Sequence, residues 1–429
     1  MRIYIGNKEI AGYFMRLKDG FDKIGVKADL VFLVGNKFYE VKTSTLLMLN
    51  QRLFDFFKKY KKSIYFPAVI PAVMLMAIFR VYILTSSLVK YDIFILNSEP
   101  FFNYSELAIL KWFKKKIIIV FLGTESRPSY ISGNYVQGKY FTNGKYNYDL
   151  CYKDVKAQAS RITRIEKYAD HIINHPPTAL FQKKPFIAWC HIGFPNDIPA
   201  KSLKIKQNHS RIVKVLHAPS NAISKGSETI IDIIDKLRKD GLPVEFQKLQ
   251  NVPNEKVLDE LAKCDFVVDE LYSDIPIGGL GTEAAFAMKP VINGGYYAEQ
   301  IKDDYPKSVI PPSCFCMPEN LELCIKEYIL DKSKRENDAK ILNTFVTENW
   351  NSTTIALKYI RIIAGDIPAE WKYDPAEIKY FMGYGIEKNK LKSFLNEYIK
   401  KFGDKALFLD DKPTLKSKII EFLNGYSSI

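Results

Sequence analysis

The chain has 429 residues and a mass of 49.4 kDa, which suits two domains of ordinary size and excludes a minidomain. Hydrophobic residues make up 47% and charged residues 26%, an average globular composition that excludes disorder as the dominant state. The formal net charge of +14 falls entirely in the first half: residues 1–200 hold 29 Lys and Arg against 15 Asp and Glu, and residues 201–429 hold 33 of each. We therefore expect the first half to face an anionic partner such as a phosphate, a nucleic acid or a membrane surface.

The first half alternates segments with the periodicity of strands and helices. Strands are expected at 2–6, 28–34, 92–96, 116–122 and 171–174, and helices at 9–24, 46–60, 105–113 and 154–168. Apolar strands between helices are typical of a parallel sheet that is covered on both faces. Residues 123–153 are polar, aromatic and rich in glycine, which predicts a long functional loop.

A second alternation begins after the lysine-rich stretch 201–210, which we expect to be a linker. Strands are expected at 212–217, 244–249, 266–268 and 290–293, helices at 227–239, 254–263 and 282–288, and a helical pattern over 320–364. The sequence thus predicts two doubly wound, Rossmann-like α/β domains, 1–200 and 201–365. A helical extension, 366–429, is expected to follow, with helices near 386–401 and 414–424.

The cysteines and histidines show no pattern of a metal or redox site. No CxxC pair and no zinc-ligand spacing occurs among the six cysteines, which predicts a reduced, cytoplasmic chain. Cys314, Cys316 and Cys324 could form a metal or redox cluster, but we expect them to be small buried hydrophobes. The histidines lack metal spacing, and no Asp-x-Asp pair occurs. We therefore expect neither a metal nor a cofactor.

The stretch 63–79 tests whether the chain enters a membrane. It contains 17 uncharged residues, includes two prolines and is closed by Arg80, whereas a spanning helix needs about 20 mostly apolar residues. We expect a buried helix or an interfacial hydrophobic surface here rather than a span. Because lysines cluster at 58–62 and 114–116, we also expect this half to dock peripherally on the anionic cytoplasmic leaflet.

The most informative stretch is IPIGGLGTEAAFAMKPVI at 275–292. Its glycines lead into a helix whose first turn is expected to hold Thr282 and Glu283. Glycines let backbone N–H groups approach a phosphate, to which a helix N-terminus adds partial positive charge, and a carboxylate there can accept the two ribose hydroxyls. Alternatively, the glycines form only a tight turn and Glu283 serves the helix dipole.

Lys225 stands between the end of strand 212–217 and the start of helix 227–239. Its ammonium group is suitably placed there to pair with a diphosphate. Together with the glycine-rich stretch, it predicts a phosphate-binding site in the second domain.

These segments resemble the GT-B glycosyltransferases, in particular the group 1 (family 4) enzymes of bacterial surface polysaccharide synthesis. The resemblance is carried, in chain order, by YDIF at 91–94, FLGTESR at 121–127, HAPSN at 217–221 with Lys225-Gly226, NVPNE at 251–255, CDFVVDEL at 264–271 and EAAFAMKPVI at 283–292. It covers roughly residues 1–365 and is strongest over 211–295. The last segment is similar to the family's EAMAxGKPVI, with Met288 where glycine is usual.

The resemblance implies a transferase whose second domain binds a nucleotide-sugar and whose first domain binds a glycan or lipid-linked acceptor. It further implies a retaining reaction that needs no metal. Glu283 would hold the ribose, Lys225 the diphosphate and loop 250–252 the base. The donor-binding residues that it implies are Asn221, Lys225, Gln250, Asn251, Val252, Gly278, Gly279, Thr282 and Glu283.

The catalytic residues implied by the resemblance are Lys225, Glu283, Glu125 and Asn97. Glu125 replaces an aspartate of the family, and Asn97 stands where members often carry a histidine. Many members have a further glutamate on the donor sugar, and its position here is Ile275. The alternatives are an inactive nucleotide-sugar-binding scaffold and a GT-B epimerase or phosphorylase. A nucleic-acid partner is not expected, since no RNA- or DNA-binding motif occurs.

Overall fold

The computed structural model describes residues 1–34, 45–60, 66–197 and 211–425, so the predicted linker lies outside the described residues. Packing divides the chain into two compact units. Unit 1 comprises Met1–Leu122, Arg164–Ile173 and Ser352–Ala369, and unit 2 comprises Gly123–Thr163, Asn174–Asn351 and Glu370–Ile429. These units cross the boundaries predicted at residues 200 and 365, and the scheme of two domains and an extension stays a prediction.

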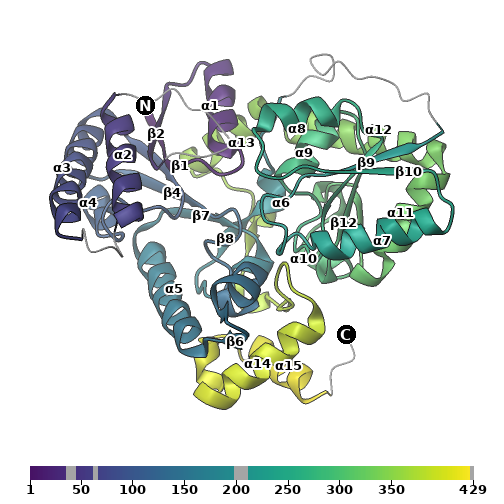
Figure 1. The fold of residues 1–429 in the computed structure, drawn as a ribbon. Coiled ribbons are helices and arrows are strands. Elements are labelled where there is room, and N and C mark those ends of the chain that lie inside the picture. Colours follow the sequence, from purple (N-terminus) through teal and green to yellow (C-terminus); the bar gives the residue numbers. More distant parts are fainter. Residues whose placement is uncertain (35–44, 61–65, 198–210, 426–429) are drawn as a thin grey trace. The chain divides into compact units, whose positions relative to one another are not determined.

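Unit 1 is built on parallel strands in the order β7-β4-β3-β1-β2 (Figure 1). Their bounds are β1 Ile3–Lys8, β2 Ala28–Val34, β3 Ile93–Leu96, β4 Lys116–Val120 and β7 His171–Asn174. The side chains of β1, β3 and β4 are buried almost throughout, as expected where helices cover both faces of a sheet. The prediction of a parallel α/β sheet is confirmed.

The helices of unit 1 are α1 (Tyr13–Lys23), α2 (Thr45–Tyr60), α3 (Phe66–Lys90), α4 (Glu106–Trp112) and α13 (Ser352–Ala364). α13 packs on α1, where the Tyr13 and Tyr359 hydroxyls lie 2.9 Å apart. Crossovers between parallel strands are right-handed, so α3 and α4, which lead into β3 and β4, cover the face opposite to α1. In agreement, Arg80 of α3 donates a hydrogen bond to the carbonyl of Phe101, just before α4 (2.9 Å).

The apolar stretch forms most of α3, and its surface is largely exposed. Within the part of the chain that the structure describes, Val69–Lys90 is the one helix long and apolar enough to cross a membrane by length and composition, with mean hydropathy 2.0. Only 28% of that window is buried. The expectation of a buried helix is therefore wrong for most of this surface, and the expectation of an interfacial surface rather than a span stays a prediction.

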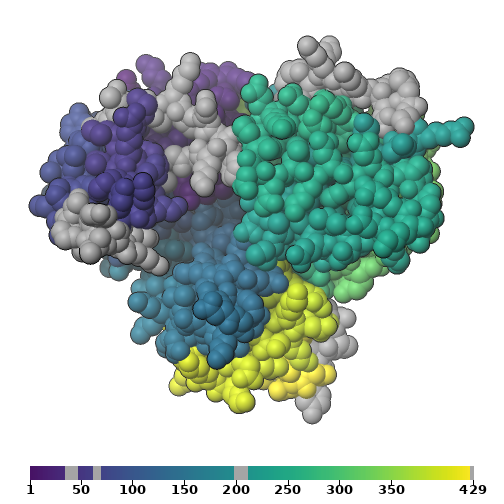
Figure 2. All heavy atoms as spheres, in the orientation of Figure 1, coloured from purple at the N-terminus to yellow at the C-terminus, as the bar shows by residue number. Residues whose placement is uncertain are grey.

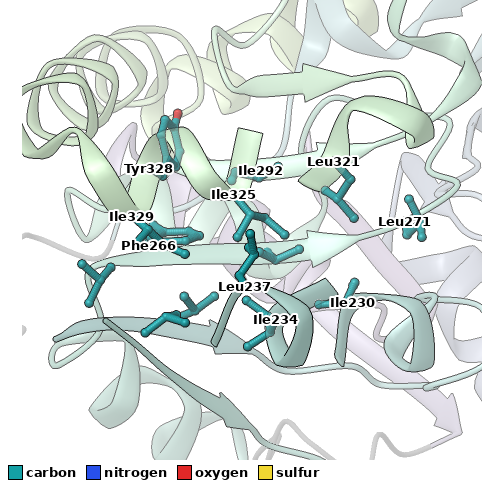
Figure 3. Packing of buried hydrophobic residues seen from close by; sticks show 14 residues of the cluster. Ile230, Ile234, Leu237, Phe266, Leu271, Ile292, Leu321, Ile325, Tyr328 and Ile329 are labelled. Carbon is teal, nitrogen blue, oxygen red and sulfur yellow. The ribbon is translucent and has the colours of Figure 1, made fainter. Parts of the chain in front are cut away.

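Unit 2 contains a second parallel sheet, in the order β10-β9-β11-β12-β13. Its elements are β9 (Val213–His217), α7 (Ser227–Lys239), β10 (Val244–Lys248), α8 (Asn254–Leu261), β11 (Phe266–Glu270), α9 (Gly279–Phe286), β12 (Val291–Gly294), β13 (Cys314–Cys316), α11 (Leu321–Leu330) and α12 (Lys332–Asn349). Ile234 and Leu237 of α7 and Ile325 of α11 pack with Phe266 over one face of the sheet (Figure 3). Right-handed crossovers place α8 and α9 on the other face.

Residues 123–153, predicted as a loop, hold short 3₁₀ and π-helical turns at Ser129–Ile131 and Asn134–Lys139 and a hairpin of β5 (Phe141–Thr142) and β6 (Lys145–Tyr146). The C-terminal helices α14 (Lys388–Phe402) and α15 (Pro413–Asn424) are present near where they were expected. Tyr152 stacks on Phe402 at 4.7 Å, and Tyr146 meets Phe394 edge-on at 5.1 Å. The C-terminal residues, yellow in Figure 2, thus pack against this blue segment within unit 2.

The remaining elements are shorter or connect these parts. They are α5 (Tyr148–Tyr168), β8 (Phe186–Ala188), which pairs antiparallel with β14 (Lys372–Tyr373), and the single-turn helices α6 (Trp189–Ile192) and α10 (Ile301–Asp304). Cys314, Cys316 and Cys324 come together where β13 meets α11 and pack half-buried against the core cluster of unit 2.

Candidate functional site

A buried ionic cluster lies at the carboxyl edge of the unit 2 sheet. Asp269 and Glu270 end β11, and Lys225 precedes α7 after β9. The Lys225 Nζ lies 3.1 Å from Asp269 Oδ1 and also pairs with Glu270 Oε1, while only 12% of the lysine side chain is exposed. Burial works against the ammonium charge, but Asp269 and Glu270 outweigh it and raise the pKa of Lys225. Burial also raises the pKa of Glu270, against the effect of Lys225.

The glycines of the β11–α9 connection leave room for this cluster. A Cβ at Gly278 would lie 3.0 Å from Asp269 Oδ2 and 3.1 Å from Glu270 Oε1. The Gly281 N–H donates to the same Asp269 oxygen at 3.1 Å. Asp269 therefore bridges Lys225 and the start of α9, which brings two of the predicted elements together.

α9 begins at Gly279, three residues before the predicted start. The expected place of Glu283 in the first turn is therefore wrong, since no acidic residue lies in that turn, and Thr282 is the fourth residue of the helix. The Thr282 hydroxyl is buried and donates to the Gly278 carbonyl at 2.8 Å. The Thr282 hydroxyl therefore donates its hydrogen bond to the backbone at the start of its own helix.

Glu283 lies beside the loop that is predicted to contact the base. Its two carboxylate oxygens each lie 3.1 Å from Nδ2 of Asn254, the first residue of α8. Gln250 and Asn251, just before α8, are exposed, and Val252 is partly buried. Sequence reasoning missed Asn254, although it belongs to the NVPNE segment.

Asn221 shapes the turn that presents Lys225. Its Oδ1 accepts hydrogen bonds from the backbone N–H groups of Ile223 (3.0 Å) and Ser224 (3.1 Å). This acceptor is therefore used by the turn, as is typical of asparagine in such positions.

A second buried ion pair, between Arg127 and Asp274, lies in the same unit. Arg127 Nε donates to Asp274 Oδ2 at 2.9 Å, and both side chains are almost fully buried. His175 Nε2 lies 2.7 Å from the Asp274 carbonyl oxygen, and burial lowers the pKa of His175 to about 4. The acidic residue next to Ile275 is thus held by Arg127 in a rigid network.

Glu125 and Asn97 lie in different units. Glu125, in unit 2, accepts at its backbone carbonyl a hydrogen bond from Gln158 Nε2 (3.4 Å). Asn97, in unit 1, donates from Nδ2 to the Lys8 carbonyl (2.6 Å) and accepts at Oδ1 from the N–H of Glu99 (3.0 Å). Asn97 thereby joins the ends of β1 and β3.

Residues 1–34, 45–60, 66–197 and 211–425 hold no group of three or more His, Cys, Asp or Glu side chains arranged for a metal ion. That the chain works without a metal stays a prediction.

No protein-family model matches the sequence, and no curated protein matches it. Several solved structures match the fold. Trehalose-6-phosphate synthase OtsA matches with a TM-score of 0.52 and 9% identity over 86% of this chain and 100% of that chain. HepE of Anabaena in complex with UDP matches at 0.48 and 11% (85% and 100%), and UDP-GlcNAc 2-epimerase of Methanocaldococcus jannaschii at 0.41 and 8% (85% and 100%). The expected GT-B fold class is confirmed, and these identities show the fold alone.

Proposed function

We propose that this protein is a glycosyltransferase that moves a hexosyl group from a nucleotide-sugar to a glycan or lipid-linked acceptor, as in polysaccharide biosynthesis. The observation that carries this proposal is the cluster of Lys225, Asp269 and Glu270 beside the glycine-lined start of α9. In open α/β sheets, ligands bind at the carboxyl ends of the strands. Lysine and backbone N–H groups there suit a diphosphate.

The cluster suggests how a diphosphate is accommodated. Two carboxylates share one ammonium, so a phosphate oxygen must displace one of them from Lys225. Because burial raises the pKa of Glu270, this carboxyl can take up a proton as the anion approaches. Lys225 then stabilises the leaving diphosphate in the transfer step.

In the proposed mechanism, the configuration at the anomeric carbon is retained and no metal takes part. The leaving diphosphate accepts the proton of the acceptor hydroxyl, which attacks from the same face of the sugar. Glu283, beside Asn254, accepts the ribose hydroxyls. Each of these roles rests on the resemblance together with the placement of the side chains in unit 2.

A nucleotide-sugar-binding scaffold, or an epimerase, is the second candidate. It is favoured by the donor-sugar position, where Ile275 carries no charge and the neighbouring Asp274 is held by Arg127. The two candidates differ in what they release: only a transferase frees a nucleoside diphosphate in proportion to a glycosylated product.

The experiment begins with thermal-shift measurements against UDP-, GDP-, CMP- and dTDP-sugars, since a ligand of the folded state raises its apparent stability. The donor that binds is then supplied with lipid-linked acceptors, and nucleoside diphosphate release is measured. Glu283→Gln should weaken donor binding by roughly 10- to 150-fold, because a hydrogen bond to a charged group is lost. Glu322→Gln, on an exposed pair with Lys236, is the matched control. Failure of every donor to bind would reject the proposal, whereas binding without release would favour the scaffold.

We further propose that unit 1 docks peripherally on the anionic cytoplasmic leaflet. One stripe of α3 is apolar and exposed: Ile70, Met74, Ile78, Val81 and Tyr82 are each 50–63% exposed. Soluble monomers rarely expose a continuous apolar patch of more than a few hundred Å². The stripe therefore suits the boundary between head groups and acyl chains.

The end of α4 adds aromatic and basic groups to the same face of the sheet. Trp112 is 80% exposed and Phe113 49%, and Lys114 and Lys115 follow directly. Tryptophan favours the interface, and each basic residue near an anionic bilayer contributes about 1 kcal/mol. This surface suits a lipid-linked acceptor.

Sedimentation with liposomes tests the docking. Wild-type protein should bind vesicles that contain phosphatidylglycerol, less so at high salt and weakly to pure phosphatidylcholine. The double variant Met74→Glu/Ile78→Glu should lose binding, while Leu330→Glu, at an equally exposed apolar position of unit 2, should not. Equal binding of both variants would reject α3 as the docking surface.

A further inference from the structure

The C-terminal segment Gly383-Tyr384-Gly385 is fixed against two loops of unit 2. Both glycines are left-handed, with φ 77 and 66 degrees. A Cβ at Gly383 would collide with the Ile131 carbonyl, and one at Gly385 would lie 2.7 Å from the carbonyl oxygen of Ser224, the residue before Lys225. Only glycine allows this close approach.

Backbone hydrogen bonds hold the same segment from both sides. The Tyr384 N–H donates to the Ile131 carbonyl (3.1 Å), and its carbonyl accepts from Gly133 N–H (2.7 Å). The Gly385 N–H donates to the Tyr272 carbonyl at 2.8 Å, just beyond β11. The segment is therefore pinned, and the direction of the Tyr384 side chain is set by the fold.

The Tyr384 side chain lies among the charged groups of the site. The Arg127 guanidinium stands over its ring, 4.5 Å from the centroid. Tyr384 also interacts electrostatically with Glu270 and Lys225, and burial raises the pKa of its phenol, so the hydroxyl stays protonated. Within the ranges that the structure describes, this hydroxyl makes no hydrogen bond, and the side chain is partly exposed.

The cationic side chains near this place are already paired. Lys225 is paired with Asp269 and Glu270, and Arg127 is paired with Asp274. An incoming anion must displace a carboxylate to reach either cation. The Tyr384 hydroxyl is a donor that needs no such exchange, and it adds no charge to the site.

We propose that the C-terminal segment completes the donor site, and that the Tyr384 hydroxyl donates a hydrogen bond to the β-phosphate of the nucleotide-sugar. This inference rests on the proposed function and assigns a ligand contact to the region after residue 365. It makes Tyr384 a residue that binds the nucleotide-sugar, although Tyr384 lies more than 100 residues after Lys225 along the chain.

The test compares Tyr384→Phe with the wild-type chain. Phenylalanine keeps the ring over Arg127 and removes only the hydroxyl. Binding of UDP and UMP, and of GDP and GMP, is measured by titration calorimetry. For the pair that binds, Tyr384→Phe should weaken the diphosphate about 10-fold and the monophosphate less than 2-fold, because the β-phosphate loses its donor. Tyr152→Phe, which keeps its ring contact with Phe402, is the control and should bind both as wild type.

The outcomes separate this inference from the proposed function. If wild-type protein binds no nucleoside diphosphate, the proposed function fails. If wild type binds, Lys225→Met does not and Tyr384→Phe binds as wild type, only the role of Tyr384 is rejected. Equal weakening of diphosphate and monophosphate would also overturn the assignment, because it would place the hydroxyl on the α-phosphate or the nucleoside rather than on the β-phosphate.

Discussion

The two parallel sheets end in different chemistry at their carboxyl edges. In unit 1, Asn7 and Asn97 lie at the ends of β1 and β3. The backbone N–H of Asn7 donates to Asn97 Oδ1 (3.3 Å), and the Asn7 side chain donates from Nδ2 to the Glu99 carbonyl (2.8 Å). In unit 2, the corresponding edge holds Lys225 between Asp269 and Glu270.

This difference indicates which of the two carboxyl edges can bind a charged ligand. The side-chain amides of Asn7 and Asn97 carry no charge and bond to backbone groups and, at Asn7 Oδ1, to the Tyr4 hydroxyl, so they stabilise the strand ends. The ions of unit 2 pair with one another, and their carboxylates also accept hydrogen bonds from the Gly281 N–H and the Ser273 hydroxyl. The Lys225 ammonium can exchange a carboxylate partner when a diphosphate arrives. We therefore expect changes at the unit 2 edge to affect both stability and nucleotide binding, and changes at the unit 1 edge to affect stability alone.

The largest effect is expected for Lys225→Met. It leaves Asp269 and Glu270 buried without a counter-charge, which should cost about 3–5 kcal/mol of unfolding free energy and abolish diphosphate binding. The triple variant Lys225→Met/Asp269→Asn/Glu270→Gln should recover most of the stability but not the binding. Urea denaturation and calorimetry measure the two effects. A single variant as stable as wild type would show that the ions do not stabilise this edge.

A change of pH should alter the stability of the two units in opposite directions. Burial raises the pKa of Glu9, at the end of β1, from 4.5 to about 7, so unit 1 loses stability as pH rises through that window. Burial lowers the pKa of His175 and His217 from 6.5 to about 4, so these two histidines make unit 2 lose stability as pH falls through that window and together outweigh the opposite contribution of Glu270. Each group accounts for about 3 kcal/mol at most.

Hydrogen exchange, read separately for the two units between pH 4 and 8, measures these trends. Glu9→Gln should flatten the response of unit 1 and leave that of unit 2 unchanged. Parallel responses of the two units would contradict the prediction.

Asn97→Ala should cost about 1–3 kcal/mol, because the backbone N–H of Asn7 and Glu99 and the carbonyl of Lys8 lose a buried partner. Diphosphate affinity should stay within 2-fold of wild type. If instead turnover were lost while the urea midpoint stayed the same, Asn97 would act in catalysis, as the resemblance implies, and the contrast between the edges would fail.

The smallest effect concerns Met288, which follows α9 with a left-handed φ of 56 degrees. Met288→Gly should stabilise the protein by about 0.5–1 kcal/mol, because glycine adopts this conformation without steric cost. The urea midpoint should rise slightly. A loss of stability would show that the half-exposed Met288 side chain packs usefully where α9 leads into β12.

Local signals predicted much of the fold. β2, β7 and α7 have the bounds that periodicity gave them, because apolar strands and an amphipathic helix are local patterns. α1 begins at Tyr13 rather than residue 9, since Ala11 and Gly12 are left-handed. The carboxylate of Glu9 accepts the N–H of Met15 (2.9 Å) at this helix start. Such a start depends on hydrogen bonds that no periodicity reveals.

The candidate site was predicted only where its residues are local. Lys225 and Gly278 stand just before the starts of α7 and α9, so position in the alternation was enough to single them out. Asp269, the partner of Lys225, and Asn254, the partner of Glu283, come from other elements. Tyr384 comes from a region without resemblance to the family. The one local signal for Tyr384 was its place between two glycines.

The division of unit 1 into three stretches of chain has a consequence for its synthesis. α13, which covers α1, starts at Ser352, more than 300 residues after α1 has left the ribosome. At about 5–20 residues per second, α1 waits on the order of 20–60 s for its partner. α1 can pack on β1 and β2 early, but the part of its surface that α13 covers stays open during translation, and a fragment that stops before residue 352 should leave it uncovered.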